Sequence, residues 1–171
     1  CDRVLAPNRP MAELLRAGEA AGRVRLWSRG VDRSRFSPAR RDPAWRRAQG
    51  FDDDEVVVLF FGRLVMEKGV TAFTESVSAA MRANARIRAL VVGDGPARAA
   101  FEAGLPGAVF TGELSGEALG RAVASADILL NPSRTEAFGN VTLEAMAAGL
   151  AVVCPRAPST LDLVEHEATG L

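Results

Sequence analysis

The sequence has little of the chemistry that builds disulfide frameworks or metal centres. It contains only 2 cysteines, Cys1 and Cys154, and 1 histidine, His166. Cysteines so far apart along the chain support neither a disulfide framework nor the close spacing of metal ligands, so we interpret both as free thiols. His166 lies between Glu165 and Glu167 in a polar stretch, and we expect it at the surface.

Long apolar runs and net charge are also absent. The longest apolar run, residues 56–61, has 6 residues, whereas a membrane-spanning helix needs about 18 or more. We therefore expect a soluble, cytoplasmic piece, with any membrane contact made by another part of the protein. Lys plus Arg and Asp plus Glu both number 21, which gives a formal net charge of zero. No broad basic surface for nucleic acid is expected, although a small anionic ligand needs only a local cationic site.

The two ends of the sequence suggest a piece of a longer protein. The chain begins with Cys1 and has no basic and apolar leader, so we expect no signal peptide and a natural start further upstream. It stops at Leu171, directly after an apparent turn toward another strand. With 171 residues and 48% hydrophobic content, the chain is long enough for one α/β domain with a real core.

The first 54 residues read as an interdomain segment and linker. We expect a short strand at residues 3–6, a helix opened by Asn8 and Pro10, and a second short strand at residues 24–27, because proline is tolerated in the first turn of a helix. Residues 33–54 are polar and rich in arginine, and we interpret them as a solvated linker with a short helix. The acidic run at residues 52–54 is expected to be a solvated turn.

From residue 55 to residue 171, apolar stretches alternate regularly with helical ones. Strands that are apolar on both faces and separated by helices predict a parallel sheet covered on each side, which is the doubly wound, Rossmann-like α/β fold. The expected strands are residues 56–61, 87–92, 109–111, 127–131 and 151–154, and the expected helices are residues 68–84, 97–103, 115–125 and 141–148.

Ligands of such sheets bind beyond the carboxyl ends of the strands, so the loops at those ends are the places to search. After the first strand come Gly62, Arg63 and Lys68, followed by a helix. A planar guanidinium fork, a lysine point charge and a helix amino terminus together suit a diphosphate. The alternative is that Arg63 and Lys68 are solvated charges paired with Glu67.

The loop at residues 93–96, Gly-Asp-Gly-Pro, is a turn that permits close backbone approach. Its glycine pattern lacks the third glycine or alanine of a dinucleotide fingerprint and follows the second strand rather than the first, so we do not expect NAD binding or an oxidoreductase.

The loop at residues 131–140 is the most informative. Glu136 can accept hydrogen bonds from hydroxyl groups, and Gly139 leaves backbone N–H groups open to sugar or phosphate at a helix start. Glu144 follows within the helix, surrounded by Leu143, Ala145 and Met146. A carboxylate there could complement the helix dipole, but a solvated acid is out of place among such neighbours, and we predict a buried or ligand-bound one.

In combination, these motifs resemble the C-terminal domain of GT-B glycosyltransferases of family 4. The resemblance rests on Gly62-Arg63 with Glu67-Lys68-Gly69, on residues 92–96, and on Glu136 and Glu144, whose spacing of seven intervening residues matches the E-x7-E signature of that family. It covers nearly the whole chain in order. Residues 25–32 are also similar to the interdomain region of members that use GDP-mannose or related donors.

The resemblance implies a retaining transfer of a hexose, of mannose or glucose type, from a nucleoside diphosphate sugar to an acceptor hydroxyl, with no metal required. It also implies that the N-terminal acceptor domain is absent from this chain, and that this chain alone binds donor without turnover. Implied catalytic residues are Arg63, Lys68 and Glu136. The implied donor-binding residues are Gly62, Arg63, Lys68, Leu114, Glu136, Phe138, Gly139, Asn140 and Glu144.

Some choices stay open at this stage. The resemblance implies that the loop at residues 112–115 faces the nucleobase. Guanine-binding members can place an aspartate in this loop, but the neighbouring residues here are Ser115 and Gly116, so the sequence does not define the base. A nucleotide-sugar-binding module without catalysis and a GT-B nucleotide-sugar epimerase are the alternative functions. The epimerases use acids and a histidine from both halves, and the glutamate spacing favours the transferase.

Overall fold

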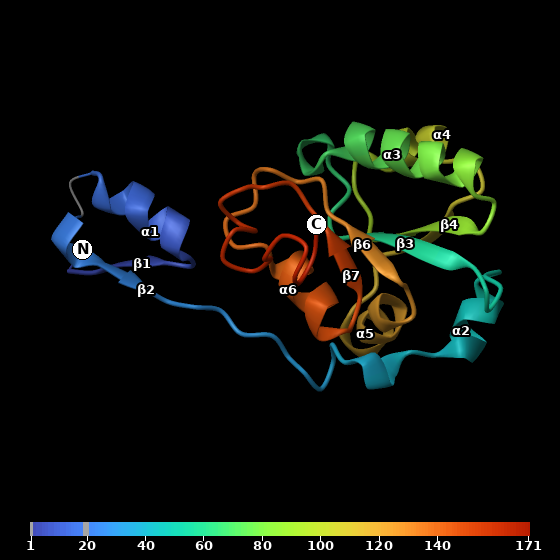
Figure 1. Ribbon diagram of the computed structural model, residues 1–171, viewed down its shortest axis with the longest axis horizontal. Helices are drawn as coiled ribbons and strands as arrows, with labels where there is room; N and C mark the ends of the chain where they lie inside the picture. Colours follow the sequence, from blue (N-terminus) through green and yellow to red (C-terminus); the bar gives the residue numbers. More distant parts are fainter. Residues whose placement is uncertain (1, 19–20) are drawn as a thin grey trace.

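The computed structural model describes residues 2–18 and 21–171, and its first elements form a small unit (Figure 1). Two short parallel strands in this unit pair with each other, Val4 opposite Val24, and a helix lies between them in the sequence. The strands and helix predicted in this region are confirmed to within a residue or two. Their bounds are β1 Val4–Ala6, α1 Arg9–Arg16, η1 Ala21–Arg23 and β2 Val24–Leu26.

The rest of the chain is built around a five-stranded, wholly parallel sheet in the order β5-β4-β3-β6-β7. This order confirms the doubly wound fold: the chain first builds outward from β3 in one direction, then returns to build β6 and β7 on its other side. The elements are β3 Val56–Phe61, η3 Met66–Lys68, α3 Val70–Ala83, β4 Ile87–Val92, α4 Arg98–Gly104, β5 Val109–Gly112, α5 Gly116–Ala124, β6 Ile128–Leu130, α6 Asn140–Ala147 and β7 Ala151–Val153.

The central strand β3 contributes side chains to two hydrophobic cores. Because side chains alternate along a strand, Val57, Leu59 and Phe61 enter one core, with residues of α5 and α6, whereas Val58 and Phe60 enter the other, with residues of α3 and α4. Figure 1 shows α3 and α4 above the sheet and α5 and α6 below it. Burial on both faces explains why β3 is apolar at every position.

The prediction that residues 33–54 form a solvated linker was wrong in part. The predicted short helix is present as α2 (Pro43–Ala48), preceded by η2 (Pro38–Arg40). The segment is not solvated throughout, however, because it packs along the α5 side of the domain. Phe36 and Phe51 are 3% and 1% exposed and belong to the α5/α6-side core. The acidic run at residues 52–54 is exposed at the amino end of β3, as predicted.

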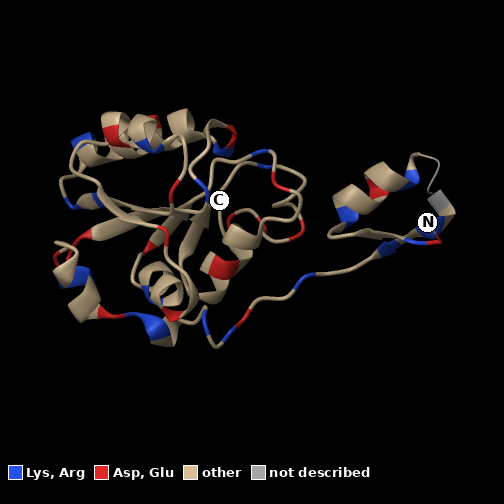
Figure 2. Cartoon of the chain, turned by 180° about the vertical axis from the view of Figure 1, so that it is seen from behind, with Lys and Arg blue, Asp and Glu red and all other residues tan. Residues whose placement is uncertain are grey.

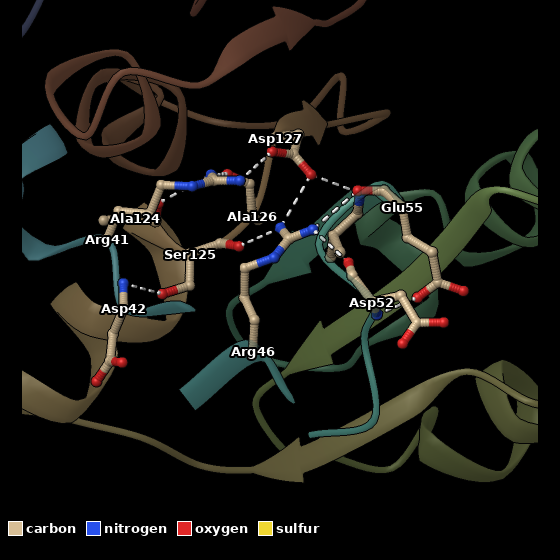
Figure 3. Close-up of polar contacts among 10 residues, drawn as sticks. Arg41, Asp42, Arg46, Asp52, Glu55, Ala124, Ser125, Ala126 and Asp127 are labelled. Atoms are coloured by element: carbon tan, nitrogen blue, oxygen red, sulfur yellow. Dashed lines mark hydrogen bonds and ion pairs between the residues drawn. The ribbon is translucent and has the colours of Figure 1, made fainter. Parts of the chain in front are cut away.

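Arg46 of α2 is buried at the amino-terminal edge of the sheet, with 2% of the residue exposed. Its guanidinium donates to the Ser125 carbonyl at 2.7 Å, to Asp127 Oδ2 at 3.0 Å and to the Glu55 carbonyl at 2.8 Å (Figure 3). A buried charge needs this degree of pairing to be tolerated. The contact therefore fastens α2 to the starts of β3 and β6.

Asp127 is the acidic centre of the same edge. Besides Arg46, it accepts hydrogen bonds from the Val57 N–H at 2.8 Å and from Arg41 at 2.6 Å. Burial raises the pKa of Asp127, but the hydrogen bonds from Val57, Arg41 and Arg46 outweigh burial and leave that pKa below its ordinary value. The carboxylate is thus held in its charged form.

Basic and acidic residues are interspersed along the helices and loops of the chain (Figure 2). Across residues 2–18 and 21–171, no helix combines the length and apolarity required to cross a bilayer.

Candidate functional site

The carboxyl ends of β3 and β4 come unusually close together. Gly93 has φ 136°, and a Cβ at this position would lie 1.9 Å from the Gly62 carbonyl oxygen. No L side chain fits there, which explains the glycine and confirms the close approach expected of residues 93–96. The loops after β3 and β4 therefore share one wall of the site.

A cavity of about 430 Å³ opens at this edge. It contains Gly62, Arg63 and Leu114, three of the residues predicted to bind the donor. Glu113 belongs to the loop at residues 112–115 that the resemblance assigns to the nucleobase. Leu119 was not singled out from the sequence, because its position depends on how α5 packs. The lining is Phe61, Gly62, Arg63, Val92, Gly93, Asp94, Gly95, Pro96, Glu113, Leu114 and Leu119.

A much smaller cleft, of about 20 Å³, adjoins this cavity between β3 and β6. Lys68 and Glu136 line it, together with Val141 at the start of α6, and Gly62 and Arg63 line both the cleft and the cavity. Lys68 and Glu136 form a direct ion pair, with side chains 26% and 18% exposed. The structure thus brings the predicted diphosphate lysine and the predicted sugar glutamate into contact.

Arg63 pairs only weakly, with Glu67. Its guanidinium lies 3.5 Å from Glu67 in an ion pair whose two side chains are 70% and 63% exposed. The alternative that the basic residues pair with Glu67 is therefore correct for Arg63, but Lys68 pairs with Glu136 instead. An exposed pair at this distance contributes little, so the Arg63 guanidinium can turn toward a ligand.

The loop between β6 and α6 is anchored at both of its ends. At the start, the Asn131 side chain donates to Thr142 Oγ1 at 3.1 Å and accepts from the Ser133 N–H at 3.2 Å. At the end, Gly139 has φ 87°, and a Cβ there would lie 2.9 Å from the Ser159 carbonyl oxygen. Glycine is therefore required where the chain turns into α6.

Two further predicted donor residues, Phe138 and Asn140, flank that turn. The Phe138 side chain is 9% exposed and so anchors the loop, whereas Asn140 is exposed at the first position of α6. Neither Phe138, Gly139 nor Asn140 is part of the lining of the cavity or the cleft.

Glu144 lies on α6 just beyond this loop and is half-buried, as predicted. Burial raises the pKa of Glu144, and the nearby positive charge of Arg35 opposes that rise only in part. Glu144 lines neither the cavity nor the cleft. A carboxylate that is costly to bury and lacks a dedicated partner is typical of a functional position.

The remaining predictions concern cysteine and histidine. Cys154 is a free, partly buried thiol, and His166 is exposed with 76% of its side chain accessible. Cys1 lies outside the described residues. Within residues 2–18 and 21–171, no three His, Cys, Asp or Glu side chains gather in a group that could hold a metal ion.

Comparison with known proteins agrees with this geometry. The family model described as "Glycosyl transferases group 1" matches residues 55–171. A GDP-mannose-dependent alpha-mannosyltransferase of Mycobacterium tuberculosis is 39% identical over 170 residues, which is 99% of this chain and 43% of that protein. The sulfoquinovosyl transferase of Arabidopsis thaliana is 36% identical over 175 residues, covering 99% of this chain and 33% of its own length. The chain thus spans less than half of these relatives.

Solved structures show the same fold. Anabaena HepE in complex with UDP-glucose superposes with a TM-score of 0.83 at 24% identity, over 100% of this chain and 49% of that one. The sucrose-phosphate synthase of Thermosynechococcus elongatus superposes with a TM-score of 0.81 at 27% identity, over 100% of this chain and 45% of that one. The fold is the Rossmann-like domain of the GT-B architecture, as predicted, and the chain belongs to the group 1 glycosyltransferase family.

Proposed function

We propose that residues 55–171 bind a nucleoside diphosphate sugar and form the donor half of a retaining glycosyltransferase, which transfers a hexose to an acceptor hydroxyl. The observation that carries this proposal is the junction at Arg63. A cavity of about 430 Å³ and a small cleft of about 20 Å³ adjoin there, and Gly62 and Arg63 line both. A donor has the same layout, with a nucleoside and a sugar on either side of a diphosphate.

The position of each group follows from its chemistry. The nucleoside base occupies the larger, mostly apolar cavity beside Leu114. The ribose extends beyond that cavity toward the half-buried Glu144 carboxylate, which accepts from its hydroxyls. The diphosphate lies between Arg63 and Lys68, whose charges stabilise it as it leaves the anomeric carbon. The transferred sugar lies toward Glu136 and the backbone of residues 138–140. In this scheme fixed cations take the role that a divalent metal has in other transferases.

The donor we favour is GDP-mannose. This choice rests on the relatives from Mycobacterium tuberculosis, Mycolicibacterium smegmatis and Corynebacterium glutamicum, which are named GDP-mannose-dependent alpha-mannosyltransferases and are 39%, 41% and 35% identical to this chain.

The acceptor would be held by a further domain. The relatives are more than twice as long as this chain, and the small β1–α1–β2 unit exposes apolar side chains at Leu5, Leu26 and Trp27, which are 54%, 48% and 60% exposed. We expect the upstream part of the protein to cover these apolar side chains and to supply the acceptor site. We expect the protein to act in the cytoplasm. Residues 1–171 alone should then bind donor without steady turnover.

The test is a calorimetric titration of this chain with GDP, GDP-mannose, UDP and UDP-glucose. We expect binding of the diphosphates and tighter binding of one sugar conjugate, with the preference reduced in Glu136→Gln. Transfer by the complete protein should persist in EDTA. If sugar conjugates bind no better than bare diphosphates and Glu136→Gln changes nothing, the chain is a nucleotide-binding module and the transferase proposal fails.

A further inference from the structure

One buried side chain links the β1–α1–β2 unit to the nucleotide-binding domain. Asn8 is 5% exposed, and the two ends of its amide have different partners. Oδ1 accepts from the Met11 N–H at 2.9 Å and so caps α1, whereas Nδ2 donates to the Ala137 carbonyl at 2.9 Å. The helix cap and the contact 129 residues away therefore share one residue.

A second contact fixes the same end of α1. The Arg9 N–H donates to Asp162 Oδ2 at 2.7 Å, from the turn that follows β7. A carboxylate at a helix amino terminus is favourable because it meets unpaired N–H groups and the positive end of the helix dipole. In Figure 1 the unit lies beside the loops of the nucleotide-binding domain, joined to it through an extended stretch after β2.

The hydrogen bond from Asn8 reaches the middle of the loop between β6 and α6, which makes few other hydrogen bonds. Asn131 and Gly139 anchor the ends of this loop, but the stretch between them, residues 134–138, makes just two hydrogen bonds to other parts of the described chain. One joins Lys68 to Glu136, and the other joins Asn8 to the Ala137 carbonyl. Asn8 therefore holds the carbonyl of the residue that follows Glu136.

We propose that Asn8 is a positioning residue for the sugar subsite: by holding the Ala137 carbonyl, it fixes Glu136 in the place where the transferred sugar binds. This inference rests on the proposed function. Asn8 touches no part of the cavity or the cleft, so it acts on the sugar through Ala137 and Glu136 and leaves the nucleoside and diphosphate contacts alone. The conformation of residues 134–138 then depends on the contact of the β1–α1–β2 unit with this loop.

The chemistry of asparagine allows the two roles to be separated. Asn8→Asp keeps an oxygen that caps α1, but it replaces the N–H donor with an acceptor facing the Ala137 carbonyl. Asn8→Ala removes both contacts. Asn84→Asp is the matched control: Asn84 Oδ1 accepts from the Arg86 N–H at 3.0 Å after α3, so the same change in charge is made away from the site.

The experiment measures GDP and GDP-mannose affinity, with thermal unfolding, for the three variants in the full-length protein. In Asn8→Asp we expect unchanged GDP affinity and roughly 3- to 10-fold weaker GDP-mannose binding, the effect of one hydrogen bond, with native-like unfolding. Asn84→Asp should match the native protein throughout.

Other results would overturn the role of Asn8. A native preference for GDP-mannose that persists in Asn8→Asp means that the loop does not need this contact. An equal loss of GDP and GDP-mannose affinity means that Asn8 supports the fold and not the sugar subsite. A native protein that binds both ligands equally refutes the proposed function itself, and this role with it.

Discussion

The two edges of the sheet differ in how their charged side chains are buried and paired. At the amino-terminal edge, Arg46 is 2% exposed and donates to three backbone carbonyls and to Asp127. At the carboxyl-terminal edge, the Arg63 side chain is 70% exposed and has one partner at 3.5 Å. The carboxylates differ in the same way, since the pKa of Asp127 is lowered and that of Glu144 is raised. The amino-terminal edge satisfies its charges, whereas the carboxyl-terminal edge pairs Lys68 with Glu136 but leaves Arg63 weakly paired and Glu144 costly to ionise.

The largest effect we predict comes from the amino-terminal edge. Arg46→Ala should lower the free energy of unfolding by about 3–5 kcal/mol, because it leaves the partly buried Asp127 carboxylate and several carbonyls without a donor. Urea denaturation at pH 7 measures this loss. Arg47→Ala, one residue along the same helix, is the matched control, since the Arg47–Asp53 pair is 56% and 69% exposed and should contribute less than about 1 kcal/mol. Similar losses in both variants would show that burial at this edge is unimportant.

Arg63 should show the reverse behaviour. Arg63→Ala is expected to weaken binding of a nucleoside diphosphate by about 1.5–3 kcal/mol, the scale of a hydrogen bond to a charged group, and to leave the unfolding free energy within about 0.5 kcal/mol of native. Lys68→Ala should weaken binding by a similar amount. Calorimetry with GDP, beside urea denaturation of the same samples, separates affinity from stability. Unchanged affinity in both variants would place the phosphate site elsewhere.

The amino-terminal edge should also control acid stability. Burial raises the pKa of Asp127, but hydrogen bonds from the Val57 N–H, Arg41 and Arg46 outweigh it and leave that pKa below its ordinary value. Burial also raises the pKa of Glu55, but the hydrogen bond from Arg88 outweighs it in the same way. A lowered folded pKa adds stability that is complete above the unfolded pKa, about 4, and is lost as the pH falls through the folded pKa. The urea concentration at the midpoint of unfolding should therefore decrease as the pH is lowered below about 4. Asp127→Asn should flatten that decline, and an unaltered decline would exclude Asp127 as its source.

The sequence predicted the fold because the relevant signals are local. Apolar runs and helical stretches located the strands and helices from residue 55 onward to within two residues. They also located Arg63, Lys68 and Glu136, because the carboxyl ends of parallel strands meet at one edge. The ion pair between Lys68 and Glu136 agrees with that expectation.

The contacts that were missed depend on residues far apart in the sequence. Arg46 looked like a solvated arginine because its partners Ser125 and Asp127 lie 79 and 81 residues further along the chain. The Asn8 contact with Ala137 spans 129 residues. Periodicity reports which face of an element is buried, but not which distant group will satisfy a buried charge or amide.

Glu144 gives the smallest predicted effect and the sharpest comparison with Asp127. Burial raises the pKa of Glu144, with Arg35 opposing it, so the ionised carboxylate costs stability at neutral pH, and that cost disappears as the pH falls through the folded pKa. Glu144→Gln should therefore leave the unfolding free energy equal to native or raise it by less than about 1 kcal/mol, while it weakens binding of GDP. Asp127→Asn should do the opposite, with lower stability and unchanged affinity. A Glu144→Gln variant that loses stability at pH 7 would show that the Glu144 carboxylate stabilises the folded protein. Glu144 and Asp127 would then not differ in the way proposed for the two edges of the sheet.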